Sequence, residues 1–152
     1  MTEQKAVLRQ ASSREIPILL GFIKSYYKLE SIVFFEDKVY KALIELINSN
    51  NIGRVWLIYL NNKAIGYIVL CFSYSLASFG QDGIIDEFYI DDEYRKKGIG
   101  TQILKIVMKN SKKLGLNCLY LEISKNNIAA QTLYEKLNFK FRDNYFLMKL
   151  DL

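Results

Sequence analysis

The chain of 152 residues contains no histidine, one proline and two cysteines. Without histidine, the Ser-His and Cys-His catalytic pairs and most zinc sites are excluded, because imidazole is the usual general base and a common metal ligand. Cys71 and Cys118 lie inside apolar runs ("VLCF" and "NCLYLEI"), which indicates small buried hydrophobic residues rather than a disulfide or a metal site. We therefore expect no metal, and any proton transfer must use carboxylates, tyrosine, lysine or water.

Long apolar runs are absent as well. None approaches the ~18 residues that a membrane-spanning helix needs, and the start "MTEQKAVLRQ" lacks the layout of a signal peptide. We expect a soluble, cytoplasmic protein with no membrane partner. The length and the 51% content of apolar residues predict one domain over residues 1–152.

Charge of either sign is moderate, and the net charge of +5 is too small to indicate nucleic-acid binding by itself. Acidic and basic side chains nevertheless form two adjacent blocks. The acidic block holds Asp82, Asp86, Glu87, Asp91, Asp92 and Glu93, and the basic block holds Arg95, Lys96, Lys97, Lys105, Lys109, Lys112 and Lys113. Such blocks are usually solvated surface; the alternative is that two ligand ends of opposite charge meet at one cleft. Because the lysines alternate with apolar residues and no aromatic stacking platform accompanies them, nucleic acid is not an expected partner.

Hydrophobic periodicity predicts an α+β fold, that is, a mixed α/β sheet protein. The expected strands are residues 5–10, 54–60, 64–72, 83–90 and 117–123, followed by a closing hairpin of "FKF" and "YFLMKL". The expected helices are residues 15–29, 36–48, 99–114 and 128–137. Pro17 is expected in the first turn of the first helix, where no backbone donor is needed. Residues 73–83 are expected to form a long connection.

A basic, glycine-containing segment lies between the fourth expected strand and the third expected helix. Its residues are Arg95, Lys96, Lys97, Gly98, Ile99, Gly100 and Thr101. A helix N-terminus exposes unpaired N–H groups, glycines let the backbone approach a ligand, and basic side chains add charge, so the segment is suited to a phosphate. The alternative is a tight turn with solvated lysines. The Walker and dinucleotide-binding glycine patterns are both absent.

Asn127 and Tyr134 mark the last expected helix. They are seven residues apart, close to two helical turns, and therefore lie on the same side. Ala129 and Ala130 would permit close approach of a ligand. Taken singly, Asn127 is also an ordinary N-cap and Tyr134 an ordinary half-buried aromatic residue.

The combination "IIDEFYIDDEYRKKGIGTQIL … LYLEISKNNIAAQTLYEKLNF" resembles the GNAT superfamily of acyl-CoA N-acyltransferases. Their motif is R/Q-x-x-G-x-G/A followed by an Asn and a Tyr on the next strand-helix unit. The resemblance implies a central mixed, mainly antiparallel sheet, in which the fourth and fifth strands splay apart, with about four helices on its two faces. It also implies an acetyl-CoA-dependent N-acetyltransferase, and GNAT proteins often form homodimers.

The resemblance further implies how acetyl-CoA is held. The backbone of Phe88, Tyr89 and Ile90 would pair with the pantetheine arm as an added strand would. The segment from Arg95 to Thr101 would receive the pyrophosphate mainly through backbone N–H groups. Asn127 would help to fix the cofactor, and Tyr134 would direct its hydroxyl at the thioester sulfur and protonate the departing thiolate.

An acceptor amine resembling lysine has a pKa near ~10.4 and must lose a proton before it attacks, so a base is required. Glu87 is the first candidate, at a position where many similar proteins carry a glutamate that acts through water, and Asp86 is the reserve. Strict alternation places Glu87 with Ile85 and Tyr89 on one face and Asp86 on the other, although a bulge would disturb that parity. A surface charge or a structural partner is the alternative role of Glu87.

The acceptor is expected to be a primary amine of a small molecule, polyamine-like rather than a protein N-terminus or lysine. The resemblance implies that the turn between the first two helices forms one wall of the acceptor site. Acidic residues around this turn would attract a cation, and aromatic residues could line the same cleft. The acidic residues are Glu30, Glu36 and Asp37, and the aromatic ones are Tyr26, Tyr27, Phe34, Phe35, Tyr74 and Phe79. The competing function is that of a catalytically silent module that binds acetyl-CoA as a sensor.

Overall fold

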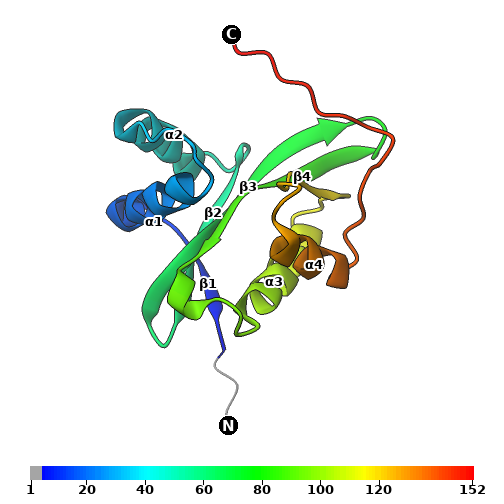
Figure 1. Cartoon of the computed structure of the whole chain (residues 1–152). Coiled ribbons are helices and arrows are strands. Elements are labelled where there is room, and N and C mark those ends of the chain that lie inside the picture. The colour runs from blue at the N-terminus through cyan, green and yellow to red at the C-terminus, as the bar shows by residue number, and fades with distance from the viewer. Residues whose placement is uncertain (1–4) are drawn as a thin grey trace. The chain divides into compact units, whose positions relative to one another are not determined.

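Residues 5–152 are described by a computed structural model (Figure 1). Contacts within the chain divide it into two compact units, one that ends at Glu122 and one that spans Ile123–Leu152. Within the described part of the chain, no helix is long and apolar enough to cross a membrane. The expectation of a single domain stays a prediction.

The helices and strands follow one another in the order predicted, up to the fourth helix. The first unit contains β1 (Val7–Gln10), α1 (Ile16–Leu29), α2 (Glu36–Asn48), β2 (Gly53–Leu60), β3 (Lys63–Ser75), β4 (Gly80–Ile90), α3 (Ile99–Lys113) and β5 (Leu119–Leu121). Short 3-10 turns precede α1 and α3, at Ser13–Glu15 and Asp92–Tyr94. The second unit contains α4 (Ile128–Lys136).

The sheet of the first unit has the order β1-β2-β3-β4-β5, antiparallel throughout except for the parallel pair β4 and β5. Alternation along the strands gives it two buried faces. Val55, Leu57, Tyr67 and Val69 pack with residues of α1 and α2 on one face. Helix α3 lies on the opposite face (Figure 1) and buries Ile103, Leu104 and Val107. This confirms the mixed, mainly antiparallel sheet with helices on both sides.

The start of α1 accommodates both a capping box at Ser12 and Glu15 and the proline at position 17. Ser12 and Glu15 form a complete capping box, in which the Ser12 N–H donates to the Glu15 carboxylate at 2.8 Å. This box caps the 3-10 turn rather than α1 itself, and Pro17 occupies the first turn of α1, where its missing N–H costs nothing. The chain thereby enters α1 with Leu19 and Ile23 directed into the core.

Residues 73–83 were expected to form a long connection, but most of them lie in strands. Strand β3 continues to Ser75 and β4 begins at Gly80, so only four residues make the turn. The register runs without interruption from Leu70 opposite Ile85 to Ser75 opposite Gly80. The polar and aromatic residues of this segment suggested a loop because both arms of the hairpin end are partly exposed, and such arms need no continuous apolar run.

The closing hairpin was also predicted wrongly, since no strand follows β5 in the described residues. Arg142 does start a turn, where its carbonyl accepts from the N–H of Tyr145 at 3.1 Å. The arms remain unpaired, and Phe146 and Met148 are each 91% exposed. Strand propensity alone does not hold a segment in a sheet without a hydrogen-bonded neighbour.

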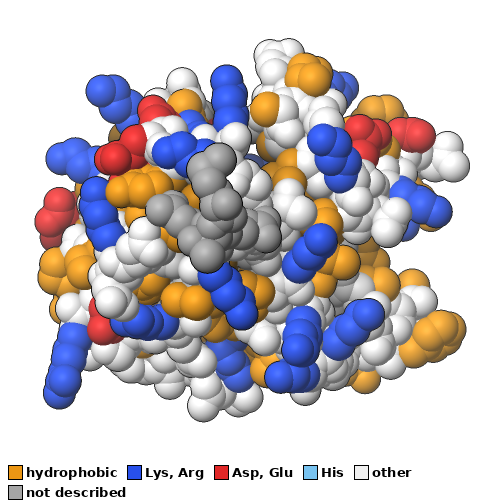
Figure 2. Space-filling model, turned by 90° about the horizontal axis from the view of Figure 1, so that it is seen from below, with side chains coloured by type: hydrophobic (Ala, Val, Ile, Leu, Met, Phe, Trp, Pro, Cys, Tyr) orange, Lys and Arg blue, Asp and Glu red, His pale blue; other side chains and the backbone are white. Residues whose placement is uncertain are grey.

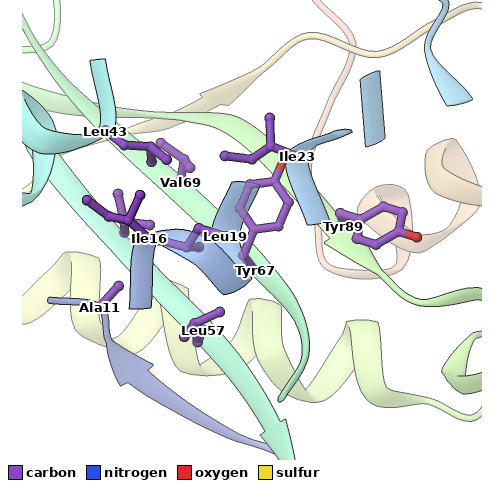
Figure 3. Packing of buried hydrophobic residues seen from close by; sticks show 10 residues of the cluster. Ala11, Ile16, Leu19, Ile23, Leu43, Leu57, Tyr67, Val69 and Tyr89 are labelled. Atoms are coloured by element: carbon purple, nitrogen blue, oxygen red, sulfur yellow. The ribbon is translucent and has the colours of Figure 1, made fainter. Parts of the chain in front are cut away.

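The core between the sheet and the first two helices surrounds Tyr67 (Figure 3). Tyr67 is fully buried, and its ring lies near Leu19 and Ile23 of α1. Leu43 of α2 packs beside Val69 of β3 at the other end of the same layer (Figure 3). This layer supports the floor of the pocket described next.

Candidate functional site

A pocket of about 290 Å³ opens between α1, α2 and the neighbouring face of β3 and β4. We call it the helix-side pocket. Its lining residues are Ile23, Tyr27, Lys38, Val39, Ala42, Leu43, Leu46, Val69, Asp86 and Glu87. All ten belong to the first unit. The lining is apolar apart from one phenol, one lysine and two neighbouring carboxylates, which is the usual composition of a small-molecule site.

Glu87 is held by two phenols. The Tyr67 hydroxyl donates to the Glu87 carboxylate at 2.6 Å, and the Tyr27 hydroxyl also bonds to it. Burial raises the pKa of Glu87, while the bonds from Tyr67 and Tyr27 act in the opposite direction. Burial together with the nearby Glu87 charge raises the pKa values of Tyr67 and Tyr27, so both phenols stay protonated as donors. A half-buried carboxylate with a raised pKa is suited to proton transfer near neutral pH.

A β-bulge in β4 brings Asp86 and Glu87 to the same pocket. Val69 pairs with Glu87 while the next residue, Leu70, pairs with Ile85, so Asp86 is the extra residue. The bulge that the resemblance allowed therefore occurs, and the strict alternation of Ile85 with Glu87 is broken. Burial raises the pKa of Asp86 as well, although its side chain remains exposed overall.

The first turn of α3 is built as an anion site would be. Gly98 is the N-cap with φ of 77°, a left-handed conformation that glycine adopts without strain, and no side chain caps the turn. A Cβ atom at Gly98 would meet nothing within 4 Å, so the surroundings of the cap are open. Lys96 and Lys97 are exposed beside it. The N–H groups of Ile99, Gly100 and Thr101 belong to the first turn, whose donors have no partner inside a helix.

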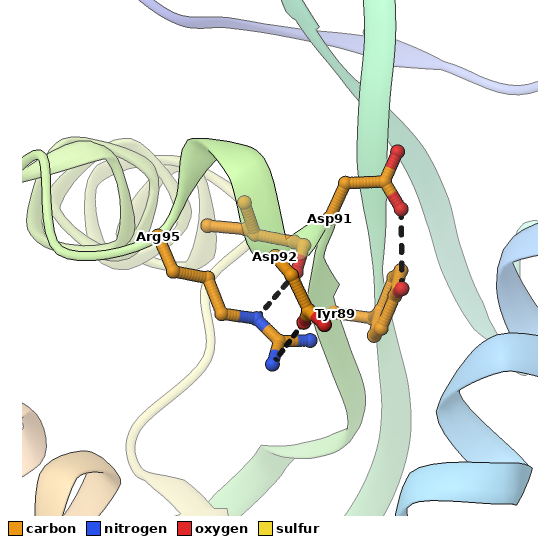
Figure 4. A network of polar contacts seen from close by, with 5 residues as sticks. Tyr89, Asp91, Asp92 and Arg95 are labelled. Atoms are coloured by element: carbon orange, nitrogen blue, oxygen red, sulfur yellow. Dashed lines mark hydrogen bonds and ion pairs between the residues drawn. The ribbon is translucent and has the colours of Figure 1, made fainter.

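Arg95 is fixed at the end of β4 by three contacts (Figure 4). Its Nε donates to the carbonyl of Ile90 at 2.6 Å, its Nη1 pairs with Asp92 at 2.5 Å, and its guanidinium lies 5.2 Å from the ring centre of Tyr89. Tyr89 in turn donates to Asp91 at 3.1 Å. The acidic and basic blocks thus meet at the ion pair between Asp92 and Arg95. The Arg95 side chain stabilises the loop between β4 and α3.

The edge of β4 that faces β5 is only partly paired. Strand β5 pairs with Gly83, Ile84 and Ile85, and β4 continues for five further residues to Ile90. Phe88, Tyr89 and Ile90 lie in this continuation, opposite β3 on their other side. Beyond Ile85, no strand of the described residues pairs with this edge of β4, which agrees with the expected splay and leaves backbone groups for an added extended segment.

In the second unit, Asn127 is the N-cap of α4. Its side chain accepts from the N–H of Ala130 at 3.1 Å, so the ordinary capping role exists. The Tyr134 ring packs edge-on against Phe139, with ring centres 5.5 Å apart. Burial raises the pKa of Tyr134 to about 12, which keeps this phenol protonated at physiological pH.

Several residues expected around the acceptor lie elsewhere. Tyr74 and Phe79 are 74% and 91% exposed on the β3–β4 hairpin end, and Asp82 is buried there with a bond from Ser78 at 2.6 Å. Of the six aromatic candidates, Tyr27 alone lines the helix-side pocket, and Glu30, Glu36 and Asp37 do not. The sequence analysis missed the contribution of α2. Val39, Leu43 and Leu46 form an apolar stripe on this helix, and the stripe was not connected with a binding site.

Lys and Arg side chains project from the surface drawn in Figure 2, with polar and apolar side chains between them. Among the described residues no group of three or more acidic, cysteine or histidine side chains is placed to hold a metal ion.

Comparison with known proteins identifies the family of the chain. The sequence profile of the acetyltransferase (GNAT) family matches residues 21–139. An N-alpha-acetyltransferase from Saccharolobus solfataricus is 28% identical over 125 residues, which cover 78% of this chain and 74% of the relative. A spermine/spermidine N(1)-acetyltransferase from Bacillus subtilis is 30% identical over 122 residues, which cover 76% of this chain and 61% of that enzyme.

A solved structure of a possible acetyltransferase from Clostridium difficile 630 has the same fold, with a TM-score of 0.85 over 98% of this chain and 99% of that one, at 22% identity. The family profile covers most of the chain, including β4, the glycine-containing segment from Arg95 to Thr101, and α4. The chain is thus a member of the GNAT family of acetyltransferases.

Proposed function

We propose that the protein transfers an acetyl group from acetyl-CoA to the primary amine of a small molecule that enters the helix-side pocket. The observation that carries the proposal is the Glu87 carboxylate, half-buried at the floor of this pocket and held there by Tyr67 at 2.6 Å. GNAT acetyltransferases use acetyl-CoA, and acetyl transfer to amines is named for both relatives described above.

The residues present fit the donor. Acetyl-CoA supplies the activated thioester. The uncapped first turn of α3 and the open surroundings of Gly98 suit a pyrophosphate, with Lys96 and Lys97 adding positive charge. The unpaired edge at Phe88, Tyr89 and Ile90 would bond to the amide-containing arm as a strand would. Asn127 and Tyr134 complete the proposed set on α4.

Glu87 is the proposed base, directly or through a water molecule. The incoming amine is an ammonium ion that must lose a proton, and a carboxylate with a raised pKa can accept it while Tyr67 and Tyr27 keep the group oriented. Asp86 is the reserve on the same bulge. Tyr134 is the proposed acid for the departing thiolate, because its phenol stays protonated.

A thiol-release assay with acetyl-CoA tests the proposed function. The amine panel should include monoamines, polyamines, amino acids, aminoglycosides and short peptides with a free N-terminus. We expect turnover of at least one small amine above the rate of acetyl-CoA hydrolysis. If acetyl-CoA binds but no amine is acetylated, the silent acetyl-CoA-binding module is the better description, and preferred turnover of the peptides would favour a protein N-terminal acetyltransferase.

Tyr67→Phe should move the acidic limb of the kcat/KM profile to higher pH. The Tyr67 hydroxyl stabilises the ionised form of Glu87 and so lowers its pKa, and its removal lets burial raise that pKa further. At the acid end of the profile we expect a loss of about ten-fold, the size of one hydrogen bond to a charged group. Tyr59→Phe removes a phenol from β2 outside the pocket and should leave the profile in place. A Tyr67→Phe profile that moves to lower pH would contradict the role of Glu87.

A further inference from the structure

We infer that the acceptor is a monoamine with an apolar arm, rather than a polyamine. The inference rests on the proposed function and goes further by assigning a substrate class to the helix-side pocket. It follows from where the charged groups of the pocket lie and from what lines the remaining wall.

The acidic groups of the pocket are confined to one place. Asp86 and Glu87 are consecutive residues on the β4 bulge, and no other acidic side chain is among the ten lining residues. One ammonium ion can therefore be neutralised beside the bulge. A second ammonium ion, several bonds further along a polyamine, would find no carboxylate in the lining.

Apart from Tyr27 and Lys38, the rest of the wall is hydrocarbon. The apolar lining consists of Ile23 of α1, Val69 of β3 and four residues of α2; the α2 residues are Val39, Ala42, Leu43 and Leu46. Each methylene of an apolar arm that leaves water against this wall should improve binding by about three- to four-fold. A charged nitrogen in the same place would lose its hydration without a compensating partner.

The remaining charged group of the lining has the wrong sign for a polyamine. Lys38 is exposed on the first turns of α2, and its ammonium lies 5.0 Å from the ring centre of Phe35. A distal ammonium that extends past the apolar wall towards solvent would approach this like charge. An uncharged arm encounters no such repulsion. The pocket therefore selects by the charge of the far end as well as by hydrophobicity.

Hexylamine and 1,5-diaminopentane are a matched pair for the test, because they have the same number of non-hydrogen atoms and differ by a methyl group in place of an ammonium. With acetyl-CoA and the full-length protein, we expect kcat/KM to be about ten-fold or more higher for hexylamine. From propylamine to hexylamine it should rise by about three- to four-fold per methylene. Equal or higher kcat/KM for the diamine would overturn the inference while leaving acetyl transfer intact. So would a peptide with a free N-terminus that exceeds every monoamine.

Lys38→Glu tests whether the charge at the pocket, rather than the net charge of the protein, determines the choice between diamine and monoamine. Placing an acidic group at this rim should shift the diamine-to-monoamine ratio of kcat/KM about five-fold towards the diamine. Lys41→Glu is the matched control, since Lys41 is exposed on the same helix, lies outside the lining and changes the net charge equally. An equal shift in both variants would overturn the role of Lys38 and with it the proposed selection by charge.

Calorimetric titration with the two amines tests the pocket without requiring turnover. Tighter binding of hexylamine in a protein that acetylates no amine would overturn the proposed function and retain the substrate class. Binding of neither amine, with or without acetyl-CoA, would overturn the substrate class even if another acceptor is acetylated.

Discussion

Glu87→Gln is expected to lower kcat/KM for the acceptor amine by about 10²- to 10³-fold, the range typical of a missing general base. The amide cannot accept the proton of the incoming ammonium ion, although its oxygen can still accept the bond from Tyr67. The remaining activity should increase with pH as free amine becomes available in solution. Steady-state rates of thiol release between pH 6 and pH 10 measure both effects.

The same substitution should not weaken the fold at neutral pH. Because burial raises the pKa of Glu87, the folded state binds the proton more tightly than the unfolded chain does. That contribution to stability is fully present below the unfolded pKa and is lost as the pH rises through the folded one. A neutral amide avoids the cost of the buried charge, so the melting temperature of Glu87→Gln at pH 8 should equal or exceed that of the parent protein.

Glu45→Gln is the control for Glu87→Gln, since Glu45 is exposed on α2 and outside the helix-side pocket. It should leave the rate and the pH profile unchanged. A large loss in Asp86→Asn together with a small one in Glu87→Gln would transfer the role of base to the reserve residue on the bulge. An unchanged profile in both variants would leave the carboxylate pair with a structural role only.

Helix boundaries could be predicted from the sequence because local signals determine them. Helix α2 spans Glu36–Asn48, as its apolar spacing indicated, and α3 begins at Ile99, directly after the glycine with positive φ. Local signals also predicted the glycine-containing segment from Arg95 to Thr101, the N-cap at Asn127 and the element order up to α4. Each depends on a few neighbouring residues, so no tertiary information is needed.

The floor and wall of the pocket depend on contacts between distant segments. Whether Glu87 and Asp86 share a face is decided by one extra residue in the pairing of β3 with β4, and alternation in a single strand does not encode that register. The bond from Tyr67 to Glu87 joins residues twenty positions apart. The α2 stripe has the same sequence pattern whether a neighbouring helix or a ligand covers it, so the hydrophobic spacing of Val39, Leu43 and Leu46 did not reveal a pocket.

The closing hairpin shows that a correctly predicted turn does not ensure that the flanking segments pair as strands. The pattern "YFLMKL" has strand-like composition and follows an actual turn at Arg142, yet the segment forms no ladder in the described chain. A strand exists only as one member of a pair, and sequence patterns report the propensity of one member. The sequence thus predicted the turn correctly and the pairing wrongly.

Tyr134→Phe is expected to lower kcat by about 10²-fold, with little change in the affinity for acetyl-CoA. The substitution removes one hydroxyl and leaves the ring against Phe139, so α4 should stay folded. Because the pKa of Tyr134 is about 12, the phenol carries its proton over the whole working range and can give it, or a hydrogen bond, to the charge that develops on the leaving sulfur. Rates under saturating amine, together with calorimetric binding of acetyl-CoA, separate the two quantities.

Tyr145→Phe is the matched control for Tyr134→Phe, because Tyr145 is an exposed tyrosine of the same unit and lies 4.0 Å from the Arg142 guanidinium. Removal of its hydroxyl should leave kcat within about two-fold, the spread expected of a surface change. Weakened acetyl-CoA binding with normal kcat in Tyr134→Phe would make Tyr134 a binding residue instead of an acid. An acid role also requires that the loss persists at every pH below about 10, since the phenol stays protonated throughout that range. A loss confined to one limb of the profile would assign the missing proton to another group.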